Sequence, residues 1–255
     1  MSTTEAQDLL EAIDRCADEP IHIPGSIQPH GFLLVVSEPD LRIQQASENV
    51  RDWLDVEARQ LLGQPLSALL PIERIQAGLP ALQDGDHNPF HLSDVQLTLP
   101  GAGDLLLALM AHRHQGQLIL EFERAGNSGQ AYQALYPLMR TFVSRLQEAR
   151  ELEALCQHAV EEVKRITGFG RVKAYRFDAE DNGLVLAEVA DPGYPSYLGL
   201  CFPAADIPQQ ARRLYRDNLI RVIQDANYQP SPLVPTLNPI SGTPLDLSFS
   251  ALRSI

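Results

Sequence analysis

The chain has 255 residues, a formal net charge of −13 and 44% hydrophobic residues. This length allows one large domain or two small ones, and the apolar content suffices for a core without disulfides. So acidic a chain repels nucleic-acid phosphates and anionic lipids, so we expect it to bind neither. Its three cysteines include no C-x-x-C pair, which argues against a disulfide framework and a cysteine-rich zinc site.

The sequence also lacks the pattern of a membrane protein. Its longest apolar run, residues 105–111, is far shorter than the roughly 18 residues that span a bilayer. The N-terminus has an early acid, Glu5, and no apolar stretch typical of a signal peptide. We therefore expect a cytoplasmic protein.

Short strands dominate the first half of the chain. After a possible helix within residues 3–15, prolines and glycines break the chain as far as Gly31. Apolar runs bounded by turn residues predict five strands, at residues 32–36, 41–46, 95–99, 105–112 and 118–123. Helical fragments are expected between the second and third strands, at residues 50–54, 56–62, 65–70 and 72–82. This order is typical of a PAS-like antiparallel sheet.

The pattern changes after residues 126–129, a Gly-Asn-Ser-Gly stretch that we interpret as a linker. Apolar residues at steps of three and four predict long helices through residues 135–146 and 152–166. Two strands and a further helix are expected next, at residues 171–177, 184–189 and 209–218. This order is typical of a GAF-type α+β domain. Residues 229–244 contain five prolines and no periodicity, so we expect them to lack regular structure.

Two stretches carry more information than periodicity. Residues 16–31 read Cys-Ala-Asp-Glu-Pro-Ile-His-Ile-Pro-Gly-Ser-Ile-Gln-Pro-His-Gly, and residues 197–215 include Cys-Phe-Pro-Ala-Ala-Asp-Ile-Pro. Both resemble motifs of the bacteriophytochromes, red-light receptors that bind the linear tetrapyrrole biliverdin. Supporting matches follow in the family's order at residues 168–177, 228–232 and 246–254.

The resemblance implies an α+β fold in which a PAS domain and a GAF domain are joined through a figure-eight knot, an exception to the rule against knots. It implies an N-terminal segment at residues 1–19, a PAS domain at 20–125 and a GAF domain at 126–255. In the family, further GAF strands, a PHY domain and a histidine-kinase output follow the last matched motif. We therefore expect an incomplete GAF domain, a complementing GAF fragment or a homodimer as partner, and no enzymatic activity in this sequence.

The resemblance also implies a covalent biliverdin cofactor attached at Cys16. A thiolate can add to a vinyl group of the tetrapyrrole and form a thioether. On its own Cys16 reads as an idle surface cysteine, but the motif that follows it favours attachment. Cys201 is a possible second attachment site, because some relatives use a cysteine in the pocket.

Asp206, Ile207 and Pro208 match a family motif that lies near the pyrrole nitrogens. The alternative is structural: Asp206 caps the helix over residues 209–218, with Pro208 in its first turn. Arg221 and Arg253 are candidate partners of the propionate groups, because guanidinium groups bind carboxylates in a bidentate manner.

Tyr175, Phe202 and Tyr215 are expected to pack against the tetrapyrrole rings, although they would look the same as ordinary core aromatics. Departures from the family pattern are Ala205, Cys201, Lys173 and Gly170. We expect no metal site, because His112 and His114 lack a third ligand at useful spacing.

The sequence therefore predicts red or far-red light sensing through covalently bound biliverdin, whose photoisomerisation is passed on as a conformational signal. The alternative functions are a chromophore-free PAS–GAF module for interaction or dimerisation and a fragment that does not photoconvert.

Overall fold

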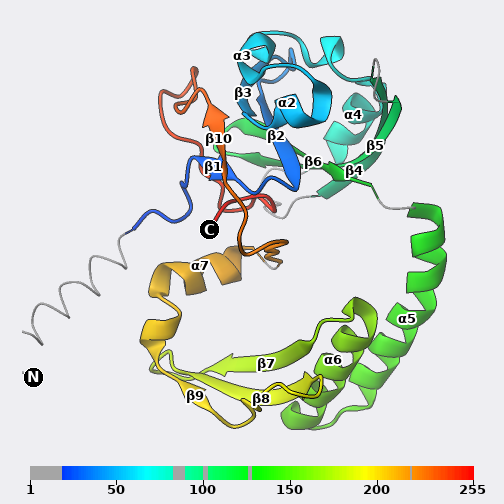
Figure 1. Cartoon of the computed structure of the whole chain (residues 1–255), viewed down its shortest axis with the longest axis vertical. Coiled ribbons are helices and arrows are strands. Elements are labelled where there is room, and N and C mark those ends of the chain that lie inside the picture. The colour runs from blue at the N-terminus through cyan, green and yellow to red at the C-terminus, as the bar shows by residue number, and fades with distance from the viewer. Residues whose placement is uncertain (1–18, 83–89, 100–102, 126–127, 219) are drawn as a thin grey trace, which may run out of the picture. The chain divides into compact units, whose positions relative to one another are not determined.

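A computed structural model describes residues 19–82, 90–99, 103–125, 128–218 and 220–255 (Figure 1). The helix expected within residues 3–15 lies outside the described residues. The chain divides into two compact units, which we describe separately. The large unit takes its residues from Asp14–Gly126 and Gln210–Ile255, and the small unit includes Asn127–Gln209.

The large unit contains a seven-stranded antiparallel sheet with the order β1-β10-β3-β2-β6-β5-β4. Its strands are β1 (Ser26–Ile27), β2 (Gly31–Val36), β3 (Ile43–Ser47), β4 (Phe90–Leu99), β5 (Gly103–His114), β6 (Gln117–Arg124) and β10 (Ser231–Val234). All five strands predicted in this region are present, with ends that differ by up to five residues. Strands β5 and β6 are joined by the two-residue turn at Gln115 and Gly116, as the Gly-containing connection predicts.

Both faces of this sheet are covered. Short helices and 3₁₀ turns lie on the first face: α2 (Val50–Leu54), α3 (Ala58–Leu61), η1 (Leu66–Ala68), α4 (Glu73–Gly78) and η2 (Leu79–Ala81). On the second face, Leu33 and Val35 of β2 pack with Leu245, Leu247 and Leu252. The whole of β2 is therefore buried, and its sequence is continuously apolar instead of alternating.

Gly31 lets the second layer approach the start of β2 closely. A Cβ atom at this position would lie 2.5 Å from the carbonyl oxygen of Phe122 and 2.9 Å from the side chain of Leu252. Any larger residue would push Leu252 away from the sheet. Leu252 can therefore pack against the start of β2 because Gly31 has no side chain.

The expectation that residues 229–244 lack regular structure is wrong for Ser231–Val234. This segment forms β10, which pairs with β3 on one side and β1 on the other. Its hydrogen bonds come from distant residues, for example Leu233 N–H to Gly25 O (2.9 Å) and Glu48 N–H to Pro232 O (2.8 Å). No local pattern could reveal them. The pairing of β1 with β10 joins residues 26–27 to residues 231–232 across about two hundred residues of sequence.

The small unit has two long helices and a three-stranded antiparallel sheet, β7-β8-β9. Helix α6 packs against β7 and β8, and α5 packs against α6 (Figure 1). The elements are α5 (Ser128–Glu148), α6 (Leu152–Thr167), β7 (Arg171–Phe177), β8 (Gly183–Ala190), β9 (Cys201–Phe202) and η3 (Ala204–Asp206), and α7 (Gln209–Asp217) follows. The short strand β9 was not predicted, because two residues carry no periodicity.

The α+β class predicted from the sequence is confirmed by these two antiparallel sheets and their helices. Within the part of the chain that the structure describes, no helix combines the length and apolar character needed to cross a membrane.

Candidate functional site

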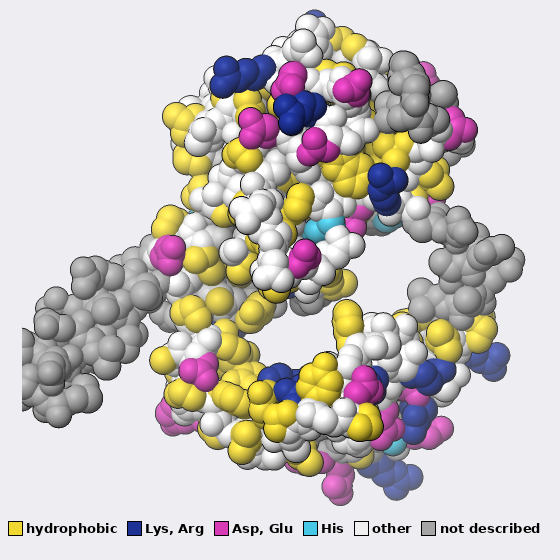
Figure 2. Space-filling view, viewed as in Figure 1, with side chains coloured by type: hydrophobic (Ala, Val, Ile, Leu, Met, Phe, Trp, Pro, Cys, Tyr) yellow, Lys and Arg dark blue, Asp and Glu magenta, His cyan; other side chains and the backbone are white. Residues whose placement is uncertain are grey.

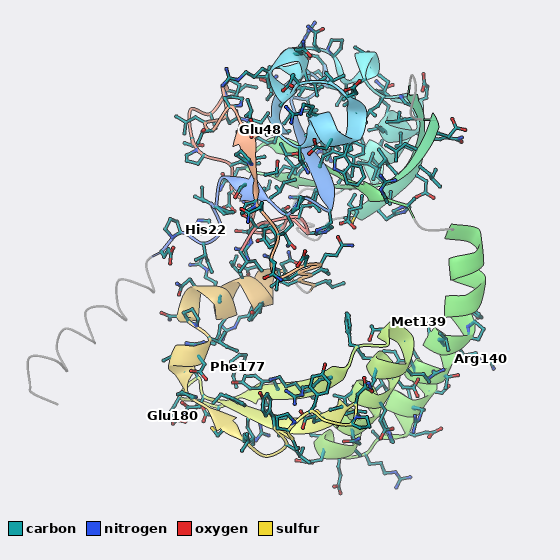
Figure 3. The ribbon with its side chains drawn as sticks, viewed as in Figure 1. His22, Glu48, Met139, Arg140, Phe177 and Glu180 are labelled. Carbon is teal, nitrogen blue, oxygen red and sulfur yellow. The ribbon has the colours of Figure 1, made fainter. Side chains whose placement is uncertain are left out.

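A cavity of about 360 Å³ lies at the sheet of the small unit. Its lining residues are Lys173, Tyr175, Phe202, Asp206 and Ile207. The rings of Tyr175 and Phe202 are 6.1 Å apart, and the ring of Phe177 meets that of Tyr175 edge-on at 5.3 Å. Figure 3 shows Phe177 and Glu180 at the end of the sheet where β7 turns into β8. Four residues selected from the sequence motif therefore lie around one aromatic cavity.

The position of Tyr175 depends on a glycine in the neighbouring strand. The ring lies across Gly183, where an added Cβ atom would lie 1.7 Å from the ring. Gly183 also pairs with Phe202 of β9, so one backbone position contacts both aromatic residues. The side chain of Asn182 accepts a hydrogen bond from Ala204 N–H (3.2 Å) and ties η3 to the same turn.

A charged pair fixes the loop that leads into β9. The Arg171 guanidinium lies 3.1 Å from the Glu188 carboxylate and stacks over the ring of Tyr197 at 4.1 Å. Glu188 also accepts hydrogen bonds from Tyr197 N–H and Ser196 O–H, both at 2.8 Å. The Tyr197 hydrogen bond, the Ser196 hydrogen bond and Arg171 hold the pKa of Glu188 below its usual value against the effect of burial.

Asp206 ends the 3₁₀ turn η3 and its side chain is exposed. Helix α7 begins at Gln209, three residues after Asp206. The capping interpretation of Asp206 stays a prediction. Burial raises the pKa of the Tyr175 hydroxyl, and the negative charges of Asp206 and Cys201 raise it further. Asp206 and Tyr175 both line the cavity.

A second group of predicted residues lies in the large unit. Arg221 donates hydrogen bonds to Ser250 O (3.2 Å) and Arg253 O (3.3 Å), and Arg253 donates to Ile21 O. Within the described residues, these guanidinium hydrogen bonds end on backbone carbonyls and not on carboxylates. We call Arg221 and Arg253 the arginine pair.

The arginine pair is held in a partly desolvated place. Arg253 is only 5% exposed, and Arg221 is half-buried. Burial and the neighbouring charge of Arg221 lower the pKa of Arg253 to about 10, and burial lowers the pKa of Arg221. Since the hydrogen bonds of both guanidinium groups end on backbone carbonyls in the part of the chain that the structure describes, these two cations in one desolvated region form a site to which an anion would bind.

The remaining predicted residues have mixed environments. Tyr215 on α7 is 49% exposed, so it is not a core residue as the alternative interpretation required. Pro208 is exposed and does not line the cavity, whereas Cys201 on β9 is an exposed free thiol next to Phe202. Cys16 lies outside the described residues, so its role stays a prediction.

His112 and His114, which the sequence analysis weighed as metal ligands, both lie beside carboxylates. His112 Nδ1 lies 3.4 Å from Glu121, and His114 Nε2 lies 3.1 Å from Asp246. Sequence reasoning did not select three residues that lie near the arginine pair or at the cavity. Gln28 binds the backbone of Arg253, Glu121 binds the backbone of Leu252, and Lys173 lines the cavity. Only Lys173 gave a signal, as a departure from the family pattern.

Comparison with known proteins places this chain in a family. The family described as the PAS fold matches residues 16–125. The chain is 42% identical over 245 residues to cyanobacterial phytochrome B of Nostoc sp., covering 95% of this chain and 32% of that protein. It is 40% identical over 252 residues to the bacteriophytochrome of Xanthomonas campestris pv. campestris, covering 95% of this chain and 38% of that protein.

Solved structures agree in both fold and sequence. The chromophore-binding domain of the bacteriophytochrome RpBphP3 from R. palustris superposes with a TM-score of 0.83 at 44% identity, covering 94% of this chain and 77% of that one. That of Stigmatella aurantiaca phytochrome P1 gives 0.83 at 45%, covering 94% and 78%. These matches define a PAS–GAF photosensory class of protein, and the chain belongs to the phytochrome family. It spans about a third of the length of the curated relatives it matches.

Proposed function

We propose that this chain binds biliverdin and takes part in sensing red or far-red light in the cytoplasm, as a sensor and not as an enzyme. The observation that carries the proposal is the arginine pair, two desolvated guanidinium groups whose hydrogen bonds, among the described residues, end on backbone carbonyls. Biliverdin carries two propionates and a conjugated system of pyrrole rings. Taken by itself, the large unit offers in the arginine pair a site for a carboxylate such as a propionate. Taken by itself, the small unit offers in the cavity with Tyr175 and Phe202 an aromatic surface for a pyrrole ring.

The residues of this chain would supply binding and orientation. Arg221 and Arg253 would form charge-assisted hydrogen bonds with a propionate. Asp206 would accept hydrogen bonds from the pyrrole N–H groups, and Ile207 and Phe202 would exclude water from the ring plane. When bound, the tetrapyrrole supplies the photochemistry, an isomerisation at a bridging double bond.

Cys16 is the proposed attachment residue. Its thiol adds across the vinyl double bond of the tetrapyrrole: sulfur bonds to one carbon, the thiol proton ends on the other, and no oxidant is needed. Cys201, exposed beside Phe202, is the second candidate for the same addition.

The experiment is to incubate the purified chain with biliverdin and to record the absorbance spectrum before and after denaturation. We expect a red absorbance band that stays with the denatured polypeptide in the wild type and is lost from it in Cys16→Ser. If the serine variant retains the pigment, Cys201→Ser decides whether that thiol is the linkage. A wild-type chain that gives no red band would contradict the proposal.

The arginine pair gives a sharper test of the same proposal. Arg253→Ala should weaken biliverdin binding by about 1–3 kcal/mol, the loss of a hydrogen bond to a charged group. Arg253→Lys should restore it only in part, because an ammonium group cannot form the planar fork. Arg51→Ala is the matched control, since Arg51 is well exposed and lies on α2. Equal affinity in Arg253→Ala, Arg221→Ala and the wild type would remove the arginine pair from the binding site.

A chromophore-free interaction module is a second candidate, and one observation favours it. Helix α5 exposes Tyr136 (59%), Met139 (40%) and Val143 (47%) at spacings that share one side of a helix. Figure 3 labels Met139 and Arg140 on this helix. Such a stripe fits a second copy of the chain. Light scattering of the wild type and Met139→Glu would detect a dimer and its loss.

A further inference from the structure

The second face of the seven-stranded sheet is covered by residues 246–254, which we call the anchor segment. Leu247 N–H donates to His22 O (2.8 Å), and Gln28 N–H donates to Leu252 O (2.7 Å). The anchor segment therefore lies between the sheet and the residues that follow Cys16. It also carries Arg253, one member of the arginine pair.

The buried carboxyl group of Glu121 hydrogen-bonds to the anchor segment from the sheet. Glu121 of β6 is fully buried, and its Oε2 accepts hydrogen bonds from Ser250 O–H and Leu252 N–H, both at 2.9 Å. Its Oε1 lies 3.4 Å from Nδ1 of His112 on the adjacent strand β5. Leu120 and Phe122 belong to the core on the first face, so the alternation along β6 turns Glu121 to the second face.

The backbone that Glu121 binds also holds the arginine pair. Ser250 O and Arg253 O both accept hydrogen bonds from Arg221. Arg253 O accepts a further hydrogen bond from Gln28 Nε2 at 3.1 Å, and Gln28 Nε2 also reaches Val222 O at 2.8 Å. Since the Arg221 contacts flank the Leu252 amide, displacement of this amide would move both guanidinium groups.

We propose that Glu121 is a positioning residue for the arginine pair: it fixes the backbone of residues 250–252 against the sheet, and this backbone sets where Arg221 and Arg253 present their guanidinium groups. The inference rests on the proposed function in one respect, namely that the arginine pair binds a propionate. The hydrogen bonds between Glu121 and the anchor segment exist in the protein without ligand and can be tested there.

The electrostatics make this hold sensitive to pH. Burial raises the pKa of Glu121 to about 7, although the hydrogen bonds from Leu252 and Ser250 lower it. The charged groups that face Glu121 are His112 on β5, Glu123 on β6 and Arg221 beyond α7. His114 and Asp246 form a separate pair at the start of the anchor segment. If release of the anchor segment hydrates Glu121, its pKa falls toward the ordinary value and rising pH favours release.

The test is amide hydrogen exchange of residues 250–253 in the ligand-free chain at pH 5.5 and pH 8, corrected for chemical exchange. We expect Glu121→Leu, which has no acceptor, to lose protection by about tenfold or more. Glu121→Gln keeps an acceptor and should stay protected while losing the pH dependence of the wild type. Glu123→Gln is the control for protection at a single pH, because Glu123 lies on the same strand and pairs with His30 at 3.8 Å. It is not compared across pH, since the charge of Glu123 contributes to the raised pKa of Glu121.

Ser250→Ala gives a second route that leaves the carboxyl group in place, and it should lower protection at Leu252 with a smaller effect than Glu121→Leu. Wild-type protection in Glu121→Leu, or an unchanged pH dependence in Glu121→Gln, would overturn the inference.

Biliverdin titration of the same variants supplies the second readout, with Glu121→Leu expected to bind at least several-fold more weakly than Glu123→Gln. Absence of binding in the wild type would overturn the proposed function alone, because the exchange data still decide whether Glu121 holds the anchor segment.

Discussion

The two sheets of this chain differ in how much of their surface is buried. In the seven-stranded sheet, every residue of β2 is buried, and layers of side chains cover both faces. In the small unit, the buried hydrophobic side chains among the described residues are Val160, Val185 and Ala187. Figure 2 shows hydrophobic side chains at the surface of the part that contains β7, β8 and β9.

This difference separates two roles that a sheet can have. A sheet covered on both faces contributes stability through apolar area removed from water. A sheet with accessible aromatic residues, such as Tyr175 and Phe202, offers a surface on which a planar ligand can stack. The large unit should therefore respond to mutation mainly through its stability, and the small unit mainly through its site.

The largest expected effect is on the core of the large unit. Phe32 is fully buried and stacks on Phe122 with ring centroids 4.6 Å apart. Phe32→Ala should lower the free energy of unfolding by about 3–5 kcal/mol. Trp53, the single tryptophan of the chain, lies 5.8 Å from Phe32, so urea unfolding followed by its fluorescence reports on this unit.

Phe177→Ala is the matched control in the small unit, where Phe177 is 36% exposed. It should change the midpoint of the Trp53 transition far less than Phe32→Ala does. Equal shifts of the midpoint in the two variants would mean that Phe177 contributes as much as Phe32 to the transition of the large unit. The proposed difference between the two sheets would then be wrong.

Sequence alternation can indicate only one face of the large sheet. The apolar residues Leu118, Leu120 and Phe122 of β6 belong to the core on the first face. Alternation alone would place Ile119 and Glu121 toward solvent, yet both are fully buried. The cover comes from Leu245 and the anchor segment, more than a hundred residues away, and no local pattern encodes that contact.

The candidate site was predicted by motif and not by periodicity. Tyr175, Phe202, Asp206 and Ile207 were selected as parts of two family motifs, and the structure gathers them around one cavity. Gly183 could not be selected in this way, because its importance arises from the Tyr175 ring that crosses it. A lysine on a strand, such as Lys173, ordinarily indicates the solvent-exposed side.

The second prediction concerns the pH dependence of the large unit. The folded chain binds a proton at Glu121 up to pH about 7, whereas the unfolded chain releases it near the ordinary value of 4.5. The contribution of Glu121 is complete below pH 4.5 and is lost as the pH rises to 7, a fall of about 3 kcal/mol in the free energy of unfolding.

Glu121→Gln should remove this slope, which is obtained by subtracting the variant's pH profile from that of the wild type. Asp246 contributes a slope of opposite sign at lower pH, because hydrogen bonds from His114 and Ser248 outweigh burial and lower its pKa. Because both proteins contain Asp246, its contribution cancels in the subtraction. Parallel profiles of wild type and Glu121→Gln between pH 5 and 7 would contradict a raised pKa at Glu121.

The third prediction tests the packing of the small sheet. Gly183→Ala should displace the Tyr175 ring and cost about 1–3 kcal/mol of local stability, as overpacking does. In a Tyr175→Ala background the same change should cost almost nothing, because the clashing ring is gone. Hydrogen exchange of the β7 and β8 amides measures both values. Additive effects would show that Gly183 and Tyr175 do not constrain each other.

The smallest effect on stability is expected at Asp206, where a substitution should change ligand binding without changing the fold. Its side chain is exposed, so Asp206→Asn should change the free energy of unfolding by less than about 0.5 kcal/mol. The variant should nevertheless lower the pKa of Tyr175, since the charge of Asp206 is one of its causes of elevation, while burial keeps the pKa above its ordinary value. Ultraviolet titration of the tyrosinate band, with Tyr175→Phe as the reference that lacks this step, measures the shift. Biliverdin binding should weaken in the same variant although the fold is intact. If instead Tyr175 titrates as in the wild type and binding is unchanged, Asp206 does not act on the cavity, and Lys173 is left as the charged lining residue that could bind a ligand there.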